Sequence, residues 1–209
     1  MTLSSLRRSA FLALGGIVAA AAPASAHHAM GGETPTNFTQ GFVSGLAHPV
    51  IGLDHLAFIL AVGLAIGVSG LNLALPIVFV ATSAVGVAMH VNGLSLPGAE
   101  LIIAASVVLI GVLIARGREL PLAAWSALFG LAGLAHGYAY GESIFGAEPT
   151  PLYAYLLGLV VIQSALSVGT ALLVRRSEAG VSAVAPRLAG AVVIGVGLTA
   201  LMGQIIPGA

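Results

Sequence analysis

The stretch LAHPVIGLDHLAF, from Leu46 to Phe58, places two histidines and an aspartate in a run that is otherwise apolar enough to cross a membrane. His48, Asp54 and His55 are ionisable, and an ionised side chain in lipid is costly unless it is paired or faces water. Intramembrane residues of this kind usually belong to a functional site. The stretch therefore predicts a membrane helix that contributes to such a site.

The composition of the whole chain supports a membrane protein. Of its 209 residues, 58% are hydrophobic and 7% are charged, and the mean hydropathy is +1.08, which is far too apolar for a soluble domain. The sequence has no lysine and no cysteine, which excludes disulfides, thiolate metal sites and a lysine Schiff base. A net charge of zero without a basic run gives no support for nucleic-acid binding.

Residues 1–26 have the pattern of a cleaved secretory signal peptide. Arg7 and Arg8 precede an apolar core from Phe11 to Ala22, and Ala24-Ser25-Ala26 provides the small residues of a cleavage site. The alternative is an uncleaved first helix, although the apolar part is short for a span of about 20 residues. Cleavage would leave the N-terminus outside the cytoplasm.

Six apolar segments of spanning length follow, separated by short breaks rich in Gly, Pro, Asn or Arg. A backbone in lipid must satisfy its own hydrogen bonds, and the ten-residue alternation of barrel strands is absent, so we expect helices. The fold class predicted is all-α, a polytopic integral membrane protein with a six-helix transmembrane domain over residues 27–209. The segments run from Gly45 to Val68, Leu73 to Val91, Pro97 to Ala115, Pro121 to Tyr140, Leu152 to Val174 and Pro186 to Ile206.

The arginines indicate the orientation of these segments, because positively charged loops tend to stay in the cytoplasm. With an exported N-terminus, the breaks after the first, third and fifth segments are cytoplasmic. Both termini are then periplasmic or extracellular, in a multi-pass protein of the bacterial inner membrane. Every arginine after the signal falls in one of these cytoplasmic breaks or directly at its edge: Arg116, Arg118, Arg175, Arg176 and Arg187.

Seven histidines and acidic residues within or beside the segments fall in the outer half of the membrane, or at its outer surface, on this topology. Imidazole and carboxylate together suit divalent nickel, cobalt or zinc, whereas the lack of cysteine argues against a copper(I) path. A proton relay uses the same residue types, and single histidines or acids also occur as interfacial or helix-packing residues. The predicted metal ligands are His48, Asp54, His55, His90, Glu100, His136 and Glu142.

The spacing of the first motif leaves two arrangements open. In a continuous helix, His48 and His55 share a face but lie about 10 Å apart along the axis, so they cannot bind one ion. Two sites in series, with His48 at the entrance, or a broken helix would follow. Pro49 removes a backbone hydrogen bond and Gly52 loosens the helix, which favours a break. Asp54 points about 100° away from His55 and either faces another neighbour or orients an imidazole.

Later segments add two local expectations. The tight break from Asn92 to Pro97 should bring His90 and Glu100 together at the outer ends of two helices. In the fourth segment, His136 and Tyr140 share a face, so Tyr140 either shapes the same cavity or serves as an interfacial aromatic.

The start of the exported chain offers another candidate metal site. Cleavage after Ala24 would expose Ser25-Ala26-His27, whose amine, amides and imidazole can chelate nickel or copper(II) in a plane. Cleavage after Ala26 would expose His27-His28 instead. The alternative is that both histidines are incidental residues of a flexible tail.

The motif His48-Pro49-x-x-Gly52-x-Asp54-His55 resembles the signature of the HupE/UreJ family of hydrogenase and urease accessory membrane proteins. The resemblance extends over essentially the whole mature chain. It implies uptake of nickel, or a similar divalent ion, for a nickel enzyme. The functional positions that it implies are His48, Asp54, His55, Glu100 and His136.

The fourth segment departs from the family pattern. In many members the sequence of this segment resembles Phe-His-Gly-x-Ala-His-Gly-x-Glu, whereas this chain reads AHGYAYGE from Ala135 to Glu142. Tyr140 replaces the second histidine and the acid comes one position early. The departure leaves the role of Glu142 open and is compatible with a subgroup of different metal preference.

These features together predict a permease rather than an enzyme, which carries nickel, or else cobalt, into the cell for maturation of hydrogenase or urease. It has no permanently bound cofactor, and without lysine it has no P-loop for ATP. The expected partners are the divalent metal ion and the lipid bilayer, with a homo-oligomer as a further candidate and no nucleic acid. The alternative is a membrane metalloenzyme, or a proton-relay or redox subunit, built on the same His and carboxylate cluster.

Overall fold

The computed structural model describes residues 33–177 and 184–206, and these residues form seven α-helices and one short 3-10 helix without any strand. The all-α prediction is confirmed for this part of the chain. The predicted signal peptide, together with His27 and His28, lies outside the described residues. The helices are α2 (Phe38–Ile51), α3 (Leu53–Val68), α4 (Pro76–Val91), α5 (Ala99–Ala115), α6 (Leu122–Tyr140), η1 (Gly141–Ile144), α7 (Pro149–Ser177) and α8 (Val184–Ile205).

The first apolar segment differs from its predicted form because it contains two helices. It begins seven residues early, at Phe38, where the side chain of Asn37 accepts a hydrogen bond from the backbone N–H of Gln40 at 3.0 Å. This is an N-cap, which satisfies one of the free N–H groups at a helix start. The segment then breaks at Gly52, and α2 and α3 meet there at 82°.

Two helices, α7 and α8, are long and apolar enough to cross a membrane by themselves. The bent pair α2 and α3 passes the same test as a unit, whereas α4 and α5 are shorter apolar helices of 16 and 17 residues. The described residues therefore contain two candidate spans, or three when the bent pair counts as one. The six predicted transmembrane helices are not confirmed.

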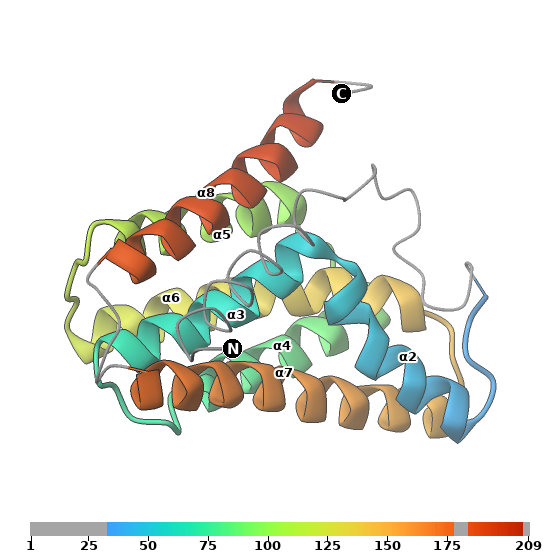
Figure 1. The fold of residues 1–209 in the computed structure, drawn as a ribbon. Coiled ribbons are helices and arrows are strands. Elements are labelled where there is room, and N and C mark those ends of the chain that lie inside the picture. Colours follow the sequence, from blue (N-terminus) through green and yellow to red (C-terminus); the bar gives the residue numbers. More distant parts are fainter. Residues whose placement is uncertain (1–32, 178–183, 207–209) are drawn as a thin grey trace, which may run out of the picture.

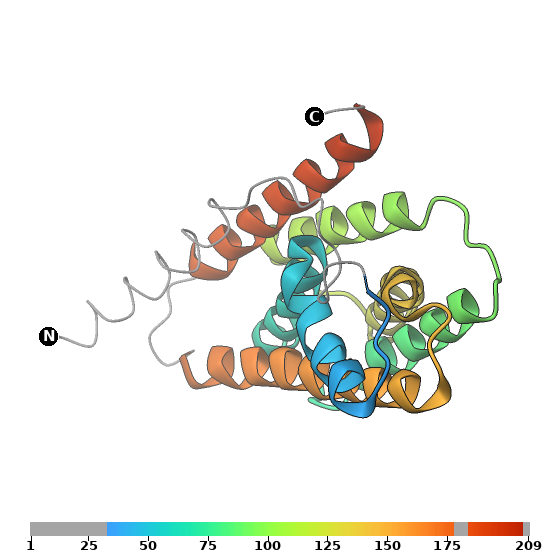
Figure 2. The same cartoon turned by 90° about the vertical axis from the view of Figure 1, so that its right-hand side faces the viewer.

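The helices pack in extended pairs. α4 lies along α6, α5 lies along α8, and α7 contacts both α2 and α3 (Figure 1). Seen after a quarter turn, α5 and α8 form one side of the bundle and α7 the opposite side (Figure 2). Glycine permits the closest of these approaches: a Cβ at Gly45 of α2 would overlap the backbone carbonyl of Tyr155 in α7. This contact brings the middle of α2 against α7.

The interior and the exterior are both apolar. Buried side chains of α3, α5 and α6, among them Phe58, Ile110 and Phe129, fill the centre of the bundle. On the outside, Leu131 and Leu173 remain 70% and 66% exposed. Helices with apolar residues on every face are typical of proteins that lie in lipid.

Candidate metal site

The helix break at Gly52 brings the two motif histidines together. Gly52 leaves the helical path with φ −75° and ψ 107°, and the ring centres of His48 and His55 lie 6.0 Å apart. A continuous helix would separate them by about 10 Å along its axis. The continuous helix, on which the two separate sites depended, is therefore wrong, and the broken-helix alternative is confirmed.

The local sequence explains both the break and the room for the imidazole. Pro49 lies inside α2 and has no N–H to donate to the carbonyl of Gly45, which weakens the last turn of the helix. The backbone angles of Gly52 are open to any residue, so its conformation does not require glycine. The space around Gly52 does require glycine, because a Cβ there would lie 2.6 Å from Cδ2 of the His55 ring.

His48, His55 and His136 form a buried histidine cluster drawn from α2, α3 and α6. Their exposed fractions are 3%, 4% and 0%. Nδ1 of His55 lies 2.7 Å from Nδ1 of His136. The hydroxyl of Tyr155 lies 2.9 Å from Nδ1 of His48, and Oγ of Ser106 lies 3.1 Å from Nε2 of His136. Each imidazole thus has a buried polar neighbour.

Aromatic rings surround this cluster. The ring centre of Tyr140 is 4.5 Å from that of His55 and 5.1 Å from that of His48, and Phe58 packs 4.7 Å from His136. Tyr140 is fully buried and packs against two rings of the cluster that contains His136. Its buried hydroxyl has no hydrogen-bond partner in the part of the chain that the structure describes.

Asp54 occupies the first turn of α3 and is half-buried. Its Oδ1 accepts a hydrogen bond of 2.8 Å from the backbone N–H of His55. A carboxylate at this end of a helix also interacts favourably with the free N–H groups there. Asp54 thereby holds the start of α3, and with it the backbone that carries His55.

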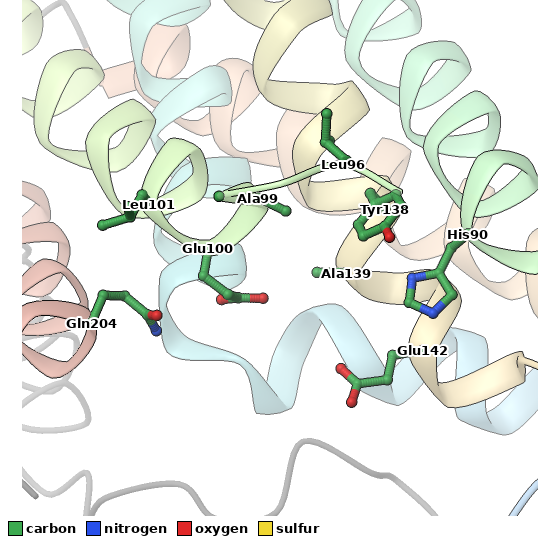
Figure 3. A pocket seen from close by; sticks show the side chains of 10 residues that line it. His90, Leu96, Ala99, Glu100, Leu101, Tyr138, Ala139, Glu142 and Gln204 are labelled. Atoms are coloured by element: carbon green, nitrogen blue, oxygen red, sulfur yellow. The ribbon is translucent and has the colours of Figure 1, made fainter. Parts of the chain in front are cut away.

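The other predicted ligands line an open pocket of about 370 Å³. His90 of α4, Glu100 of α5 and Glu142 of η1 all belong to its wall, so His90 and Glu100 line the same pocket. Figure 3 shows the carboxylate of Glu100 between Gln204 on one side and Glu142 and His90 on the other. The ring of His90 packs on Tyr138, 4.6 Å between centres.

The present geometry is not that of a preformed metal cage. Among the described residues, no three His, Asp or Glu side chains converge so that they could hold an ion. Two nitrogen ligands of a tetrahedral ion lie about 3.3 Å apart for bonds of about 2.0–2.1 Å, so the 2.7 Å between His55 and His136 is a hydrogen bond. The 6.0 Å between the ring centres of His48 and His55 fits the roughly 5–6 Å expected for two imidazoles on one ion. The ligand roles stay a prediction.

Three polar residues of these sites lack any local signal in the sequence. Tyr155 is 107 residues from His48, and Ser106 is 30 residues from His136. Gln204 lies near the end of the last helix and reaches the pocket from there. Only the packing of distant helices identifies them.

Two comparisons with known proteins found matches to this chain. The family model described as HupE / UreJ protein matches residues 15–200. Protein HupE of Rhizobium leguminosarum bv. viciae is 32% identical over 190 residues, which cover 90% of this chain and 95% of that protein. No solved structure matches.

Proposed function

The chain belongs to the HupE/UreJ family, and on that basis we propose that it is a permease that carries nickel, or cobalt, across the cytoplasmic membrane into the cell. The ion would serve the maturation of a metalloenzyme, hydrogenase or urease. The observation that carries the proposal is the break at Gly52, which buries His48 and His55 side by side. Neutral imidazole is a preferred ligand of nickel.

The open pocket would receive the ion in its hydrated form. A water molecule occupies about 30 Å³ of liquid, so a shell of six takes roughly 180 Å³ of a pocket of about 370 Å³. Glu100 and Glu142 are exposed carboxylates of its wall and would attract a cation. Ala139 belongs to the same wall, and the next residue, Tyr140, packs on the buried histidine cluster. Two consecutive residues of α6 therefore contact the pocket and the cluster.

The buried histidine cluster would bind the ion after it has lost part of its water. The aromatic rings of Tyr140 and Phe58 leave little space for water around the imidazoles. A set of a few His nitrogens exchanges its ion faster than a closed cage of four ligands, which suits passage rather than storage. The ion would bind beside the hydrogen bond between His55 and His136, because these two nitrogens are too close to share an ion as they stand.

The proposed topology has six spans, one for each apolar segment, with the bent pair α2 and α3 as the first. Arg116 directly follows α5, and Arg175 and Arg176 lie in the last turn of α7, where the positive-inside tendency would hold them in the cytoplasm. Both termini, the pocket and the cluster then face the outside of the bacterial inner membrane.

Metal uptake tests the proposal. Cells that lack other nickel uptake should accumulate nickel when they express the protein, and cobalt and zinc measured in parallel would rank the ions. Accumulation equal to that of cells with an empty vector, at verified protein levels in the membrane, would remove the proposal.

A second candidate function is a proton relay. The contacts from His55 through His136 to Ser106 form a buried chain of hydrogen-bonding groups, and such chains conduct protons in pumps. Purified protein in vesicles loaded with a pH-sensitive dye separates the two functions. Proton flux that does not depend on added nickel favours the relay, and nickel entry without such flux favours the permease.

Replacing Gly52 by alanine should lower nickel uptake about tenfold while the protein still folds. The new Cβ conflicts only with the His55 ring and not with the backbone, and misplaced groups at a site are costly well beyond their packing energy. Uptake per molecule and thermal unfolding in detergent measure the two effects. Gly169→Ala is the control, because nothing lies within 4 Å of the added methyl group. Equal uptake by both variants would contradict the role given to the break.

A further inference from the structure

The hydroxyl of Tyr155 has one hydrogen and two close neighbours. Its oxygen lies 2.8 Å from the backbone carbonyl oxygen of Tyr140 and 2.9 Å from Nδ1 of His48. A carbonyl oxygen cannot donate, so two oxygens at this distance need the tyrosine hydrogen between them. Towards His48, Tyr155 can then only accept. In the neutral imidazole, Nδ1 of His48 therefore carries the hydrogen and Nε2 carries the lone pair.

Ser106 determines the tautomers of the other two histidines in the same way. Its Oγ donates to the carbonyl oxygen of Ile103 at 2.7 Å, so it accepts from Nε2–H of His136 at 3.1 Å. The lone pair of neutral His136 is then on Nδ1. Nδ1 of His55, only 2.7 Å away, must supply the hydrogen of that bond. His55 therefore has the same tautomer as His48.

We infer that Tyr155 and Ser106 are positioning residues of the metal path, which fix the tautomers of the buried histidine cluster so that Nε2 of His48 and of His55 carries the lone pair. The ion in this statement rests on the proposed function, whereas the tautomers do not. Both nitrogens of His136 take part in hydrogen bonds, so His136 orients His55 and does not itself bind the ion in this arrangement.

The two hydrogen-bond chains end on backbone carbonyls, those of Tyr140 and Ile103, which belong to α6 and α5. Helix backbone cannot rotate as a side chain does, so each tautomer is tied to the fold itself. Partners that set the tautomer of a ligating histidine are worth about 10- to 100-fold in metal affinity. Tyr155 and Ser106 come from different helices and should act on different imidazoles.

Nitrogen NMR of the metal-free protein with ¹⁵N-labelled histidine reads the tautomers directly. The expected spectrum has hydrogen on Nδ1 of His48 and His55 and on Nε2 of His136. Tyr155→Phe should turn His48 into a mixture of tautomers, and Ser106→Ala should do so for His136 and His55. Tyr153→Phe, on an exposed ring of the same helix, and Ser167→Ala, a buried serine bonded to the carbonyl of Gln163, should leave the three signals unchanged. Hydrogen on Nε2 of His48 or His55 in the unaltered protein would overturn the inference.

Uptake kinetics test the link to the ion. Tyr155→Phe should raise the KM for nickel about tenfold with Vmax per molecule close to that of the unaltered protein, whereas Tyr153→Phe should change neither. A KM that stays the same in Tyr155→Phe would overturn its positioning role. Expected tautomers in a protein that moves no nickel would instead support the tautomer assignment and overturn the proposed function.

Conservative replacement of His136 tests its part. His136→Asn keeps an oxygen near the position of Nδ1 that can accept the hydrogen from His55, and His136→Ala removes it. A positioning role predicts a KM for His136→Asn several-fold closer to that of the unaltered protein than the KM of His136→Ala. Equal loss in both variants would indicate a direct ligand and overturn the orienting role.

Discussion

Replacing His55 by alanine is expected to reduce nickel uptake per molecule by about 100-fold or more, the largest loss at any single position. The imidazole of His55 lies beside His48 and bonds to His136, so its removal takes away a proposed ligand and the hydrogen-bond partner of His136. Loss of an outer partner alone costs a metal site about 10- to 100-fold. Uptake of radioactive nickel, divided by the amount of protein in the membrane, measures the effect.

The matched control is Ile66→Ala, which deletes a fully buried side chain from the same helix. It should lower thermal stability, since large-to-small changes in a core cost about 2–5 kcal/mol, and leave the KM for nickel unchanged. If both variants lose uptake in proportion to their folded amounts, His55 has only a structural role.

Asp54 allows charge and hydrogen bonding to be separated at the neighbouring position. Asp54→Asn retains an oxygen that can accept from the backbone N–H of His55, whereas Asp54→Ala does not. If Asp54 acts only by holding the start of α3, the asparagine variant keeps most of the uptake. If the negative charge of Asp54 contacts the ion, both variants lose most of the uptake.

The helices themselves were predictable from the sequence, because apolar runs bounded by Gly, Pro and Asn have few other options in lipid. The exact lengths of these helices were not predictable. α2 begins at Phe38 because Asn37 caps it, whereas the apolar pattern alone places the start of the segment at Gly45. The bend between α2 and α3 was predictable only as one of two arrangements, because Pro49 weakens a helix without determining where the chain turns. The turn occurs three residues later, at Gly52.

The residues of the candidate site were more predictable than the way in which they group in space. Spacing along one helix separates His48 from His55, and only the bend reverses this. The division of the predicted ligands between a buried cluster and an open pocket depends on which helices pack together. Tyr155 and Ser106 could not be predicted at all, because tyrosine and serine in apolar helices are common and their histidine partners lie 107 and 30 residues away.

Replacing both Glu100 and Glu142 by glutamine is expected to lower Vmax/KM for nickel about 100-fold, mainly through KM. The two carboxylates are exposed on the wall of the open pocket, and clefts lined by one sign of charge raise the local concentration and entry rate of counter-ions by about 10- to 1,000-fold. Glutamine keeps the shape and one acceptor oxygen of each side chain and removes the charge. Initial uptake rates at increasing nickel concentration give both constants.

Ionic strength distinguishes attraction by these charges from direct binding. Exposed charges are screened within about 8–10 Å at 0.10–0.15 M salt, so uptake by the unaltered protein should fall as salt rises, and uptake by the double variant should respond much less. Glu148→Gln is the matched control, since Glu148 is exposed just before α7 and does not line the pocket. A double variant with unchanged KM and the same salt dependence would show that the ion reaches the buried histidine cluster by another route. The pocket would then have no part in transport, even if His48 and His55 do.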